Sequence, residues 1–313
     1  MRIGLDIGGT KIAAALVDDA GTVVAQSWHE HSARGISAVA DALVRTVRAL
    51  PEAPSPLAVG VSVSGLVARD GIVTGGASLE LRGDLAAEMR PLLPHPVRVF
   101  NDAEATFRSV REDWSAQTGE TVQDAVLLTI GTGIGGALVV DGHPVRGASG
   151  LAGELGHVPV MPPSDRLCVC GSSGCLEQYA GGKGIADQAR LLIEQGTASD
   201  GLAALGRDGD GEVTAKDVVA AARRGDASSR ELLDQAARCC AQALRAICVT
   251  VEPTLVLLGG SVAHGASDLL PARIRQHLHA HWPFAGLTAP PPVHLDAIGP
   301  YAAAIGAAKL AAE

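Results

Sequence analysis

Apolar positions along the chain fall into short runs that alternate with stretches of helical spacing. Residues 1–26 are expected to form a strand, a glycine turn, a second strand and a reverse turn, and residues 125–145 repeat this pattern. Apolar residues recur at helical spacing over residues 35–50, which predicts a helix that stops at Pro51. Such alternation of strands and helices predicts mixed or parallel sheets covered by helices, that is, an α/β fold.

The same criteria place the remaining elements. A helix is expected to begin directly after Asn101 and Asp102, and the Gly/Asp-rich residues 196–212 are expected to form a mobile loop. Strands are predicted at 57–63, 97–100 and 255–258, and helices at 82–93, 175–195, 214–224, 228–251, from near 267, and 300–312.

Two glycine turns occupy the same place in the two hairpins. The first is Gly8-Gly9-Thr10-Lys11 and the second is the GTGIGG run that starts at Gly131. Backbone N–H groups free of side chains can approach phosphate oxygens, so two such turns in two similar lobes indicate a nucleotide held between them. The alternative is that glycine serves only the geometry of a tight hairpin. A strand follows each turn, whereas the dinucleotide fingerprint and the Walker A loop both need a helix there.

Composition narrows the class of protein. The chain has 25 basic and 34 acidic residues, a net charge of −9, and no basic run, which argues against a nucleic-acid groove or an anionic membrane surface. Only three Phe, three Trp and two Tyr are present, so the core is expected to be aliphatic. Neither a signal peptide nor an apolar run of membrane-spanning length is evident, and the expected location is the cytoplasm.

One histidine and three cysteines have the spacing H-x10-C-x-C-x4-C, which suits a closed tetrahedral zinc site of structural type. Gly171 and Gly174 would let the short loop turn back so that the thiolates converge. The alternative is three ordinary cysteines near an ordinary histidine. The four candidate ligands are His157, Cys168, Cys170 and Cys175.

The other cysteines and a group of three histidines are interpreted as structural residues rather than metal ligands. Cys239, Cys240 and Cys248 lie on a predicted helix and are expected to be small core residues. His277 and His281, with His279 between them, are interpreted as part of a solvated helix face.

Asp102 is the candidate catalytic residue. It stands at the end of strand 97–100, where its carboxylate could take a proton from a hydroxyl that attacks a terminal phosphate. A helix N-cap is the alternative role, since aspartate favours that position. Glu154 and Glu177 flank the metal loop, and carboxylates in a cleft suit a polyhydroxylated ligand.

These residues together resemble the ROK family of sugar kinases (repressor, open reading frame, kinase), in particular its bacterial glucokinase-like members. The resemblance spans almost the whole chain in the family's order, and the GELGH and CxCGxxGCLE motifs are highly specific. The matching segments are Asp6–Lys11, Asn101–Ala103, Gly131–Gly136, Gly153–His157, Cys168–Glu177 and Leu258–Gly260.

The resemblance implies a two-lobed actin/hexokinase-type ATPase fold with a central cleft and a small zinc-binding loop. It implies an N-terminal lobe of residues 1–115 joined by a C-terminal helix at 300–313, and a larger lobe of residues 116–299 containing the zinc loop 157–175. No N-terminal helix-turn-helix domain of the repressor members is expected, because the first phosphate turn begins within ten residues of Met1.

The resemblance also implies roles for individual residues. Asp102 would be the base for the primary hydroxyl of the sugar, Asp6 would face the Mg²⁺–phosphate region, and His157 would contact both zinc and sugar. The residues implied to bind the sugar are Gly65, Ser78, Asn101, Asp102, Glu154, His157 and Glu177. Those implied to bind the nucleotide are Asp6, Gly8, Gly9, Thr10, Lys11, Gly131, Thr132, Gly133, Gly259 and Gly260.

Several positions depart from the family pattern. Ser64 stands where proline is usual, Ser78 and Leu81 replace an asparagine and a tryptophan, Glu104 replaces an asparagine, and Ala137 replaces a glycine. A shorter Ser78 leaves one hydroxyl contact unmade or filled by water, and one such hydrogen bond shifts preference by ~1–3 kcal/mol. The acceptor is therefore expected to be a hexose, a hexose derivative such as an amino sugar, or a sugar-like cyclitol with an exocyclic CH₂OH.

The expected function is ATP- and Mg²⁺-dependent phosphorylation of a primary hydroxyl, with structural Zn²⁺, by a homodimer or homotetramer. A catalytically silent sugar sensor and a hydrolytic zinc enzyme are the alternatives from other classes. ATP and polyphosphate both remain open as donors.

Overall fold

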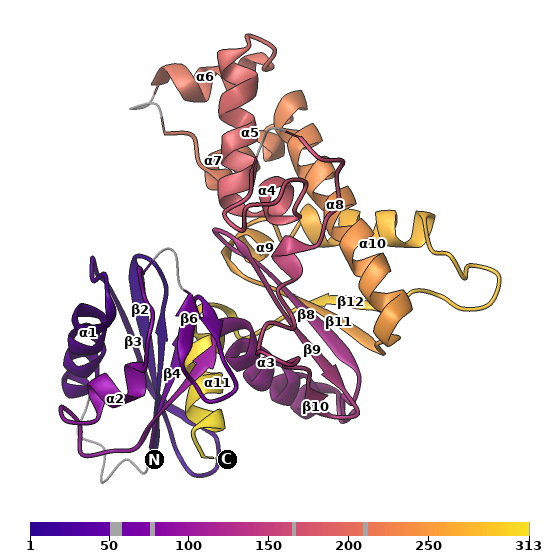
Figure 1. The fold of residues 1–313 in the computed structure, drawn as a ribbon. Coiled ribbons are helices and arrows are strands. Elements are labelled where there is room, and N and C mark those ends of the chain that lie inside the picture. The colour runs from indigo at the N-terminus through magenta and orange to yellow at the C-terminus, as the bar shows by residue number, and fades with distance from the viewer. Residues whose placement is uncertain (51–57, 76–78, 165–166, 209–211, 313) are drawn as a thin grey trace. The chain divides into compact units, whose positions relative to one another are not determined.

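The computed structural model describes residues 1–50, 58–75, 79–164, 167–208 and 212–312 (Figure 1). The chain divides into two compact units. One consists of Met1–Thr121, Pro144–Gly153 and Ala297–Glu313, and the other of Val122–His143 and Glu154–Asp296.

The first unit is built on a five-stranded mixed sheet with the strand order β3-β2-β1-β4-β7. Strands β1 and β2 are antiparallel across the first glycine turn, while β1, β4 and β7 run parallel. The strands are β1 (Arg2–Ile7), β2 (Lys11–Val17), β3 (Val23–Glu30), β4 (Ala58–Val63) and β7 (Val97–Asn101), and a separate small hairpin pairs β5 (Leu66–Val67) with β6 (Val73–Gly75).

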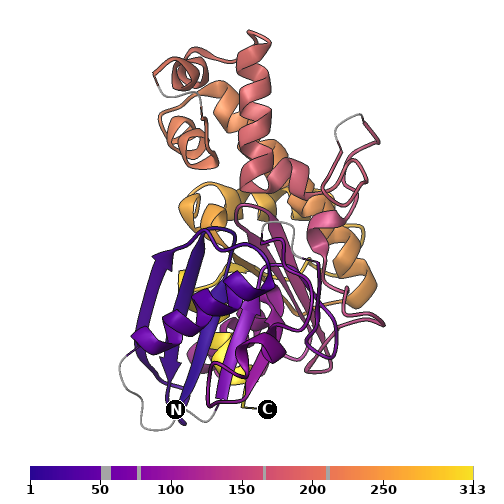
Figure 2. The same cartoon turned by 60° about the vertical axis from the view of Figure 1, so that its left-hand side comes forward.

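Helices cover both faces of this sheet. Along β2, Ala14 and Leu16 pack in the core that includes α1 (Ile36–Ala49) and α2 (Leu85–Met89). Ala15 and Val17 point to the opposite face, where they pack against α11 (Ala302–Leu310). The yellow C-terminal helix accordingly lies against the indigo and purple strands in Figures 1 and 2. Helix α3 (Asp102–Thr118) packs beside α11, which the short helix η2 (Gly299–Tyr301) precedes.

Glycine lets α11 pack directly on its neighbours. A Cβ atom on Gly4 or Gly60 would overlap the helix backbone at Ala304 or Ala307, and one on Gly306 would overlap the carbonyl of Ala105 in α3. The alanine-rich composition of 302–311 therefore reflects backbone-to-backbone packing rather than helix propensity alone.

The second unit repeats the sheet of the first, with the order β10-β9-β8-β11-β12. Strands β8 and β9 are antiparallel across the second glycine turn, and β8, β11 and β12 run parallel. This equivalence confirms the predicted duplication of the hairpin. The strands are β8 (Ala125–Ile130), β9 (Ile134–Val140), β10 (His143–Pro144), β11 (Leu255–Gly259) and β12 (Val293–Leu295).

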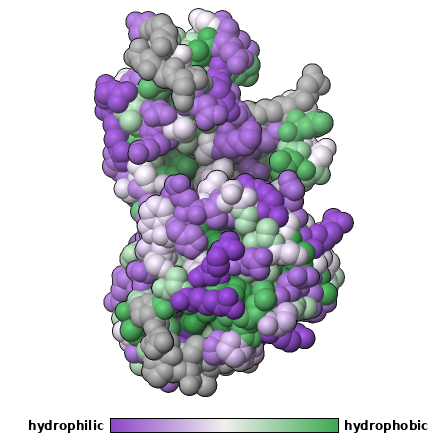
Figure 3. Space-filling view, turned by 90° about the vertical axis from the view of Figure 1, so that its left-hand side faces the viewer, coloured by the Kyte–Doolittle hydropathy of each residue, from purple (hydrophilic) through white to green (hydrophobic). Residues whose placement is uncertain are grey.

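Helices of the second unit enclose a large aliphatic core to which Cys239, Cys240 and Cys248 contribute, as predicted. Hydrophilic residues cover most of the molecular face in Figure 3. The helices are η1 (Leu155–His157), α4 (Glu177–Ala180), α5 (Gly182–Glu194), α6 (Asp200–Asp208), α7 (Ala215–Arg223), α8 (Ala227–Val251), α9 (Ser261–Gly265) and α10 (Leu270–Ala280).

Some predicted elements are wrong in detail. The helix expected over 175–195 is broken at Gly181, which is extended (φ −66°, ψ 151°). The expected loop 196–212 contains α6, because the buried Leu202 anchors it and the carboxylate of Asp226 accepts hydrogen bonds from the Leu202 N–H (3.1 Å) and the Ser199 hydroxyl (2.5 Å).

Two further boundaries shift. The helix expected over 82–93 covers only Leu85–Met89, and the one expected near 267 is preceded by α9, which starts at Ser261. Strand β12 was not predicted. The mixed sheets covered by helices confirm the predicted α/β class. Across the described ranges, no helix combines the length and apolar character needed to cross a membrane.

Candidate active site

Three predicted site segments of the first unit lie at one edge of its sheet. Strands β1, β4 and β7 are parallel neighbours, so their carboxyl ends meet at the same edge. Gly8 follows β1, Ser64 and Gly65 follow β4, and Asp102 follows β7. The topology thus brings the first glycine turn and the candidate base together, two strand spacings or about 10 Å apart.

Asn101 and Asp102 have different roles at the start of α3. The Asn101 side chain is the N-cap, because its Oδ1 accepts from the N–H groups of Ala103 (2.9 Å) and Glu104 (3.2 Å). Its Nδ2 donates to the carbonyl of Gly65 (3.0 Å), which ties β4 to β7. Asp102 is the first helical residue, not the cap, and its Oδ1 accepts from the Ala103 N–H at 2.9 Å. The half-buried carboxylate therefore sits at the positive end of the helix dipole.

Asp6 lies on β1 just before the first turn. The Ser62 hydroxyl on neighbouring β4 donates to its Oδ1 at 2.7 Å. Burial raises the pKa of Asp6 to about 6, and the hydrogen bond from Ser62 opposes that rise. A cation beside this half-buried carboxylate would favour its ionised form.

Strand β3 supports the first glycine turn. The His31 N–H donates to the Thr10 carbonyl (2.9 Å), and the His31 Nδ1 accepts from the Ala33 N–H (3.2 Å). That bond leaves the ring proton on Nε2, which donates to the carbonyl of Gly8 (2.9 Å). The Lys11 ammonium lies 4.7 Å from the centre of the Trp28 ring, a cation–π contact. Sequence reasoning missed both supporting residues, since nothing in the local pattern links them to the turn.

Backbone hydrogen bonds fix the second glycine turn within the second unit. The carbonyls of Gly131 and Thr132 accept from the N–H groups of Gly182 (2.8 Å) and Lys183 (2.9 Å) at the start of α5. Glu177 accepts from the Ile134 N–H at 2.9 Å, and a Cβ on Gly133 would overlap its carboxylate. The helix break at Gly181 is thus part of the support of this turn.

Gly259 ends β11, the parallel neighbour of β8, and Gly260 follows it, so both lie at the same sheet edge as the second turn. Gly260 has φ 91°, which favours glycine. The buried Asp296 carboxylate lies against Gly259 and 3.1 Å from Nε2 of His264, whose pKa it raises by accepting a hydrogen bond. Sequence reasoning missed Asp296 and His264.

The four predicted metal ligands form one cluster, with all ligand atoms within 4.8 Å of one another. Tetrahedral zinc with bonds of about 2.3 Å to sulfur and about 2.0 Å to nitrogen requires S–S separations of about 3.8 Å and N–S separations of about 3.5 Å. Cys170 Sγ lies 3.7 Å from Cys175 Sγ, and His157 Nδ1 lies 3.5 Å from Cys168 Sγ. The donor set and its spacing therefore fit zinc.

The loop itself is shaped for this cluster. Gly171 (φ 85°) and Gly174 (φ 77°) adopt left-handed conformations that let the loop reverse. Burial raises the pKa of the Cys168 and Cys175 thiols, so a bound cation is what would hold both as thiolates.

Predicted sugar-binding residues of the second unit adjoin the zinc loop. With Nδ1 of His157 facing Cys168, its Nε2 lies on the other side of the ring, 3.9 Å from Oε2 of Glu154. Desolvation raises the pKa of Glu154, and the charge of Glu177 adds to the rise while His157 opposes it. The structure thus gathers Glu154, His157 and Glu177 in one place.

Glu104 and Ser78 are two of the positions that depart from the family pattern. Glu104, where the family pattern has asparagine, forms an ion pair with Arg146. Ser78, a predicted sugar contact, lies outside the described residues.

Comparisons with known proteins agree with this fold. The ROK family model matches residues 2–313. The chain is 32% identical to a glucokinase of Halalkalibacterium halodurans, over 89% of this chain and 85% of that relative. It is 31% identical to an N-acetylmannosamine kinase of Salmonella typhimurium, over 83% of this chain and 82% of that relative.

A solved structure shows the same fold. The ROK family glucokinase of Streptomyces griseus, in complex with glucose and AMPPNP, superposes with a TM-score of 0.85 at 29% identity, covering 99% of both chains. The fold is thus that of a ROK-type α/β protein, and the chain carries a Cys/His cluster of a composition that fits zinc. This chain belongs to the ROK family.

Proposed function

We propose that this protein transfers the terminal phosphoryl group of ATP to the primary hydroxyl of a hexose, with Asp102 as general base. At the level of class, the protein is an ATP-dependent sugar kinase. The observation that supports the catalytic assignment is the shared sheet edge in the first unit, where Asp102 follows β7 and the first glycine turn follows β1.

In the proposed reaction, a carboxylate oxygen of Asp102 accepts the proton of the primary hydroxyl. The hydroxyl oxygen then attacks the γ-phosphorus, the bond from that phosphorus to the β–γ bridging oxygen breaks, and ADP leaves. The Asn101 cap and the Ala103 N–H hold the carboxylate at the start of α3, so the base needs little reorganisation.

Phosphate binding is assigned to the two glycine turns. The turn at Gly8–Lys11 contributes backbone N–H groups and an ammonium, and the turn at Gly131–Gly133 contributes backbone N–H groups. Gly259 and Gly260 are assigned to the nucleoside. Asp6 would hold Mg²⁺ directly or through water, and the ion, when bound, neutralises charge on the phosphates.

The remaining sugar hydroxyls are assigned to Gly65, Ser78, Asn101, Glu154, His157 and Glu177. In this arrangement Nδ1 of His157 and the three cysteines would hold a structural zinc ion. That leaves Nε2 of His157 for a sugar hydroxyl, and the ion fixes the orientation of the ring.

Glucose and N-acetylmannosamine are the two acceptors to compare first, because relatives named for each sugar match this chain at similar identity. The test is a coupled ADP-release assay with ATP and Mg²⁺ over glucose, mannose, N-acetylmannosamine and a CH₂OH-bearing cyclitol. Turnover with glucose supports the main proposal, and turnover restricted to an amino sugar or cyclitol reassigns the acceptor.

The same panel, repeated with polyphosphate, identifies the donor. Absence of turnover on every acceptor, together with thermal stabilisation by a sugar, would instead favour a silent sensor. We further propose a cytoplasmic location, because ATP and reduced thiols are both available in that compartment. We also propose a homodimer or homotetramer, which the resemblance to the ROK family implies. Light scattering on the purified chain tests the oligomeric state.

A further inference from the structure

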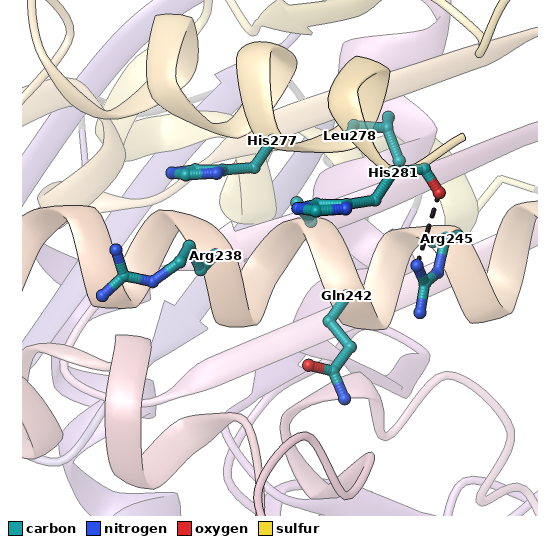
Figure 4. A pocket seen from close by; sticks show the side chains of 7 residues that line it. Arg238, Gln242, Arg245, His277, Leu278 and His281 are labelled. Carbon is teal, nitrogen blue, oxygen red and sulfur yellow. Dashed lines mark hydrogen bonds between the residues drawn. The ribbon is translucent and has the colours of Figure 1, made fainter. Parts of the chain in front are cut away.

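A pocket of about 250 Å³ lies between helices α8 and α10 of the second unit (Figure 4). That volume corresponds to roughly eight water molecules, which is enough for a phosphate group with a small substituent. Besides an alanine and a leucine, the lining consists of polar side chains that carry or can acquire positive charge, and one amide: Arg238, Gln242, Arg245, His277 and His281. None of these residues belongs to the sugar or nucleotide assignments above.

Helical spacing places the polar lining on facing sides of the two helices. Arg238, Gln242 and Arg245 recur at intervals of four and three residues along α8, and His277 and His281 are four apart at the end of α10. The interpretation of His277 as part of a solvated face was wrong, because only 18% of its side chain is exposed.

Asp234 links the two helices beside the pocket. Its Oδ1 lies 3.0 Å from both the Arg273 guanidinium and Nε2 of His277, and its other oxygen pairs with Arg238. Glu231 pairs with Arg238 as well, at 2.6 Å. The two carboxylates hold Arg238 in place and offset its positive charge. The contact with Asp234 also holds His277 in place.

Arg245 remains available to bind an anionic ligand. Within the described ranges its guanidinium forms no ion pair and donates only to the carbonyl of His281, at 3.3 Å. It is half-buried beside Gln242. Around the pocket three guanidinium groups face two carboxylates, so one positive charge remains even with neutral histidines, in a chain whose net charge is −9.

We propose that this pocket binds the phosphate group of a small phosphorylated metabolite, with Arg245 as its principal ligand. A guanidinium binds phosphate through two parallel N–H bonds, and the Gln242 amide and the His281 ring supply further donors around it. The substituent on the phosphate would occupy the remaining volume. Free inorganic phosphate and a hexose phosphate share this chemistry.

The test is calorimetric titration of the full, zinc-loaded chain at low ionic strength, first with inorganic phosphate and then with a hexose 6-phosphate. Saturating sugar and AMPPNP are present, so the residues assigned to catalysis are occupied. Wild type is compared with Arg245→Gln, Arg245→Lys and the matched control Arg224→Gln, an exposed arginine at the end of α7.

Arg245→Gln is expected to weaken phosphate binding at least about tenfold, Arg245→Lys by less, and Arg224→Gln not at all. Sugar kinase turnover measured without added phosphate is expected to be the same in all four proteins. Tighter binding of the hexose phosphate than of inorganic phosphate identifies the metabolite as the ligand, and the reverse order identifies the free ion.

Equal affinities in wild type and Arg245→Gln, or no binding to wild type, would overturn the proposal. Sedimentation of the same variants measures their association state and tests a second explanation of the pocket. A change of association state in Arg245→Gln without phosphate binding would show that this face is a subunit contact. The result does not depend on the proposed function, because binding is measured even if no sugar is turned over.

Discussion

The Ser62 hydroxyl donates a 2.7 Å hydrogen bond to Oδ1 of Asp6 in the neighbouring strand, where Ser62 is buried and Asp6 is half-buried. Burial disfavours the charged carboxylate and raises its pKa to about 6, while this hydrogen bond stabilises the charge. Ser62 stands outside every predicted binding motif, yet it is the side chain that supports an ionised Asp6.

A pH profile follows from this pair. If ionised Asp6 is needed for Mg²⁺–ATP, kcat/KM for ATP should fall as the pH drops through about 6, because the carboxylate of the free enzyme becomes protonated. Ser62→Ala should move this acidic limb upward by about one pH unit, since the lost hydrogen bond had lowered the pKa. Ser62→Thr keeps the hydroxyl and should restore the wild-type profile. An acidic limb that does not move in Ser62→Ala would contradict the assignment.

Local sequence patterns predicted the parts of the molecule that short-range physics determines. The two glycine turns, the strand at 97–100 and the helix after it follow from periodicity and turn residues within a few positions. The zinc cluster was predictable because its ligands are of diagnostic type and lie within nineteen residues of one another, His157 to Cys175.

Contacts between distant residues account for what the sequence did not reveal. His31 reaches the carbonyl of Gly8 across 23 positions, and His264 reaches Asp296 across 32. Helix α6 depends on Asp226, which supplies its N-terminal hydrogen bond from 24 residues away. Hydrogen bonds of this kind depend on the folded topology. Local secondary-structure propensity and residue spacing therefore do not predict them.

Asp102→Asn is expected to lower kcat by roughly 10²- to 10⁴-fold, because an amide cannot accept the hydroxyl proton. Zinc content and thermal unfolding should be unchanged, since the cap of α3 is Asn101. Steady-state kinetics with ATP and the best acceptor measure the effect. Asp113→Asn, a carboxylate further along the same helix that accepts from Gln117, is the matched control and should retain wild-type turnover. Near-normal turnover in Asp102→Asn would exclude the role of base.

The zinc cluster should be linked to sugar binding through the residues next to it. Cys170 is the exposed ligand, so Cys170→Ser removes one thiolate with little change to the core. Metal analysis should show one zinc ion per wild-type chain, since four ligands complete one tetrahedral site, and clearly less in the variant.

Loss of the ion should also release His157 and the segment leading to Glu177. We expect KM for the sugar to rise roughly 10- to 100-fold, with a smaller effect on KM for ATP. Cys248→Ser, which changes a buried cysteine of α8 outside the cluster, should keep its zinc. An unaltered KM for the sugar in zinc-depleted Cys170→Ser would separate the metal from the sugar site.

Packing of the C-terminal helix gives a prediction about stability. A Cβ at Gly306 would overlap the backbone carbonyl of Ala105, which cannot move without displacing α3. Gly306→Ala is therefore expected to lower the free energy of unfolding by about 2–4 kcal/mol, despite the higher helix propensity of alanine. Gly265→Ala is the matched control in α9, where an added Cβ meets no atom within 4 Å. It should leave stability unchanged or raise it by about 0.5–1 kcal/mol. Urea unfolding followed by circular dichroism measures both variants. Equal midpoints for the two would mean that α11 and α3 separate at little cost, contrary to the close backbone contact.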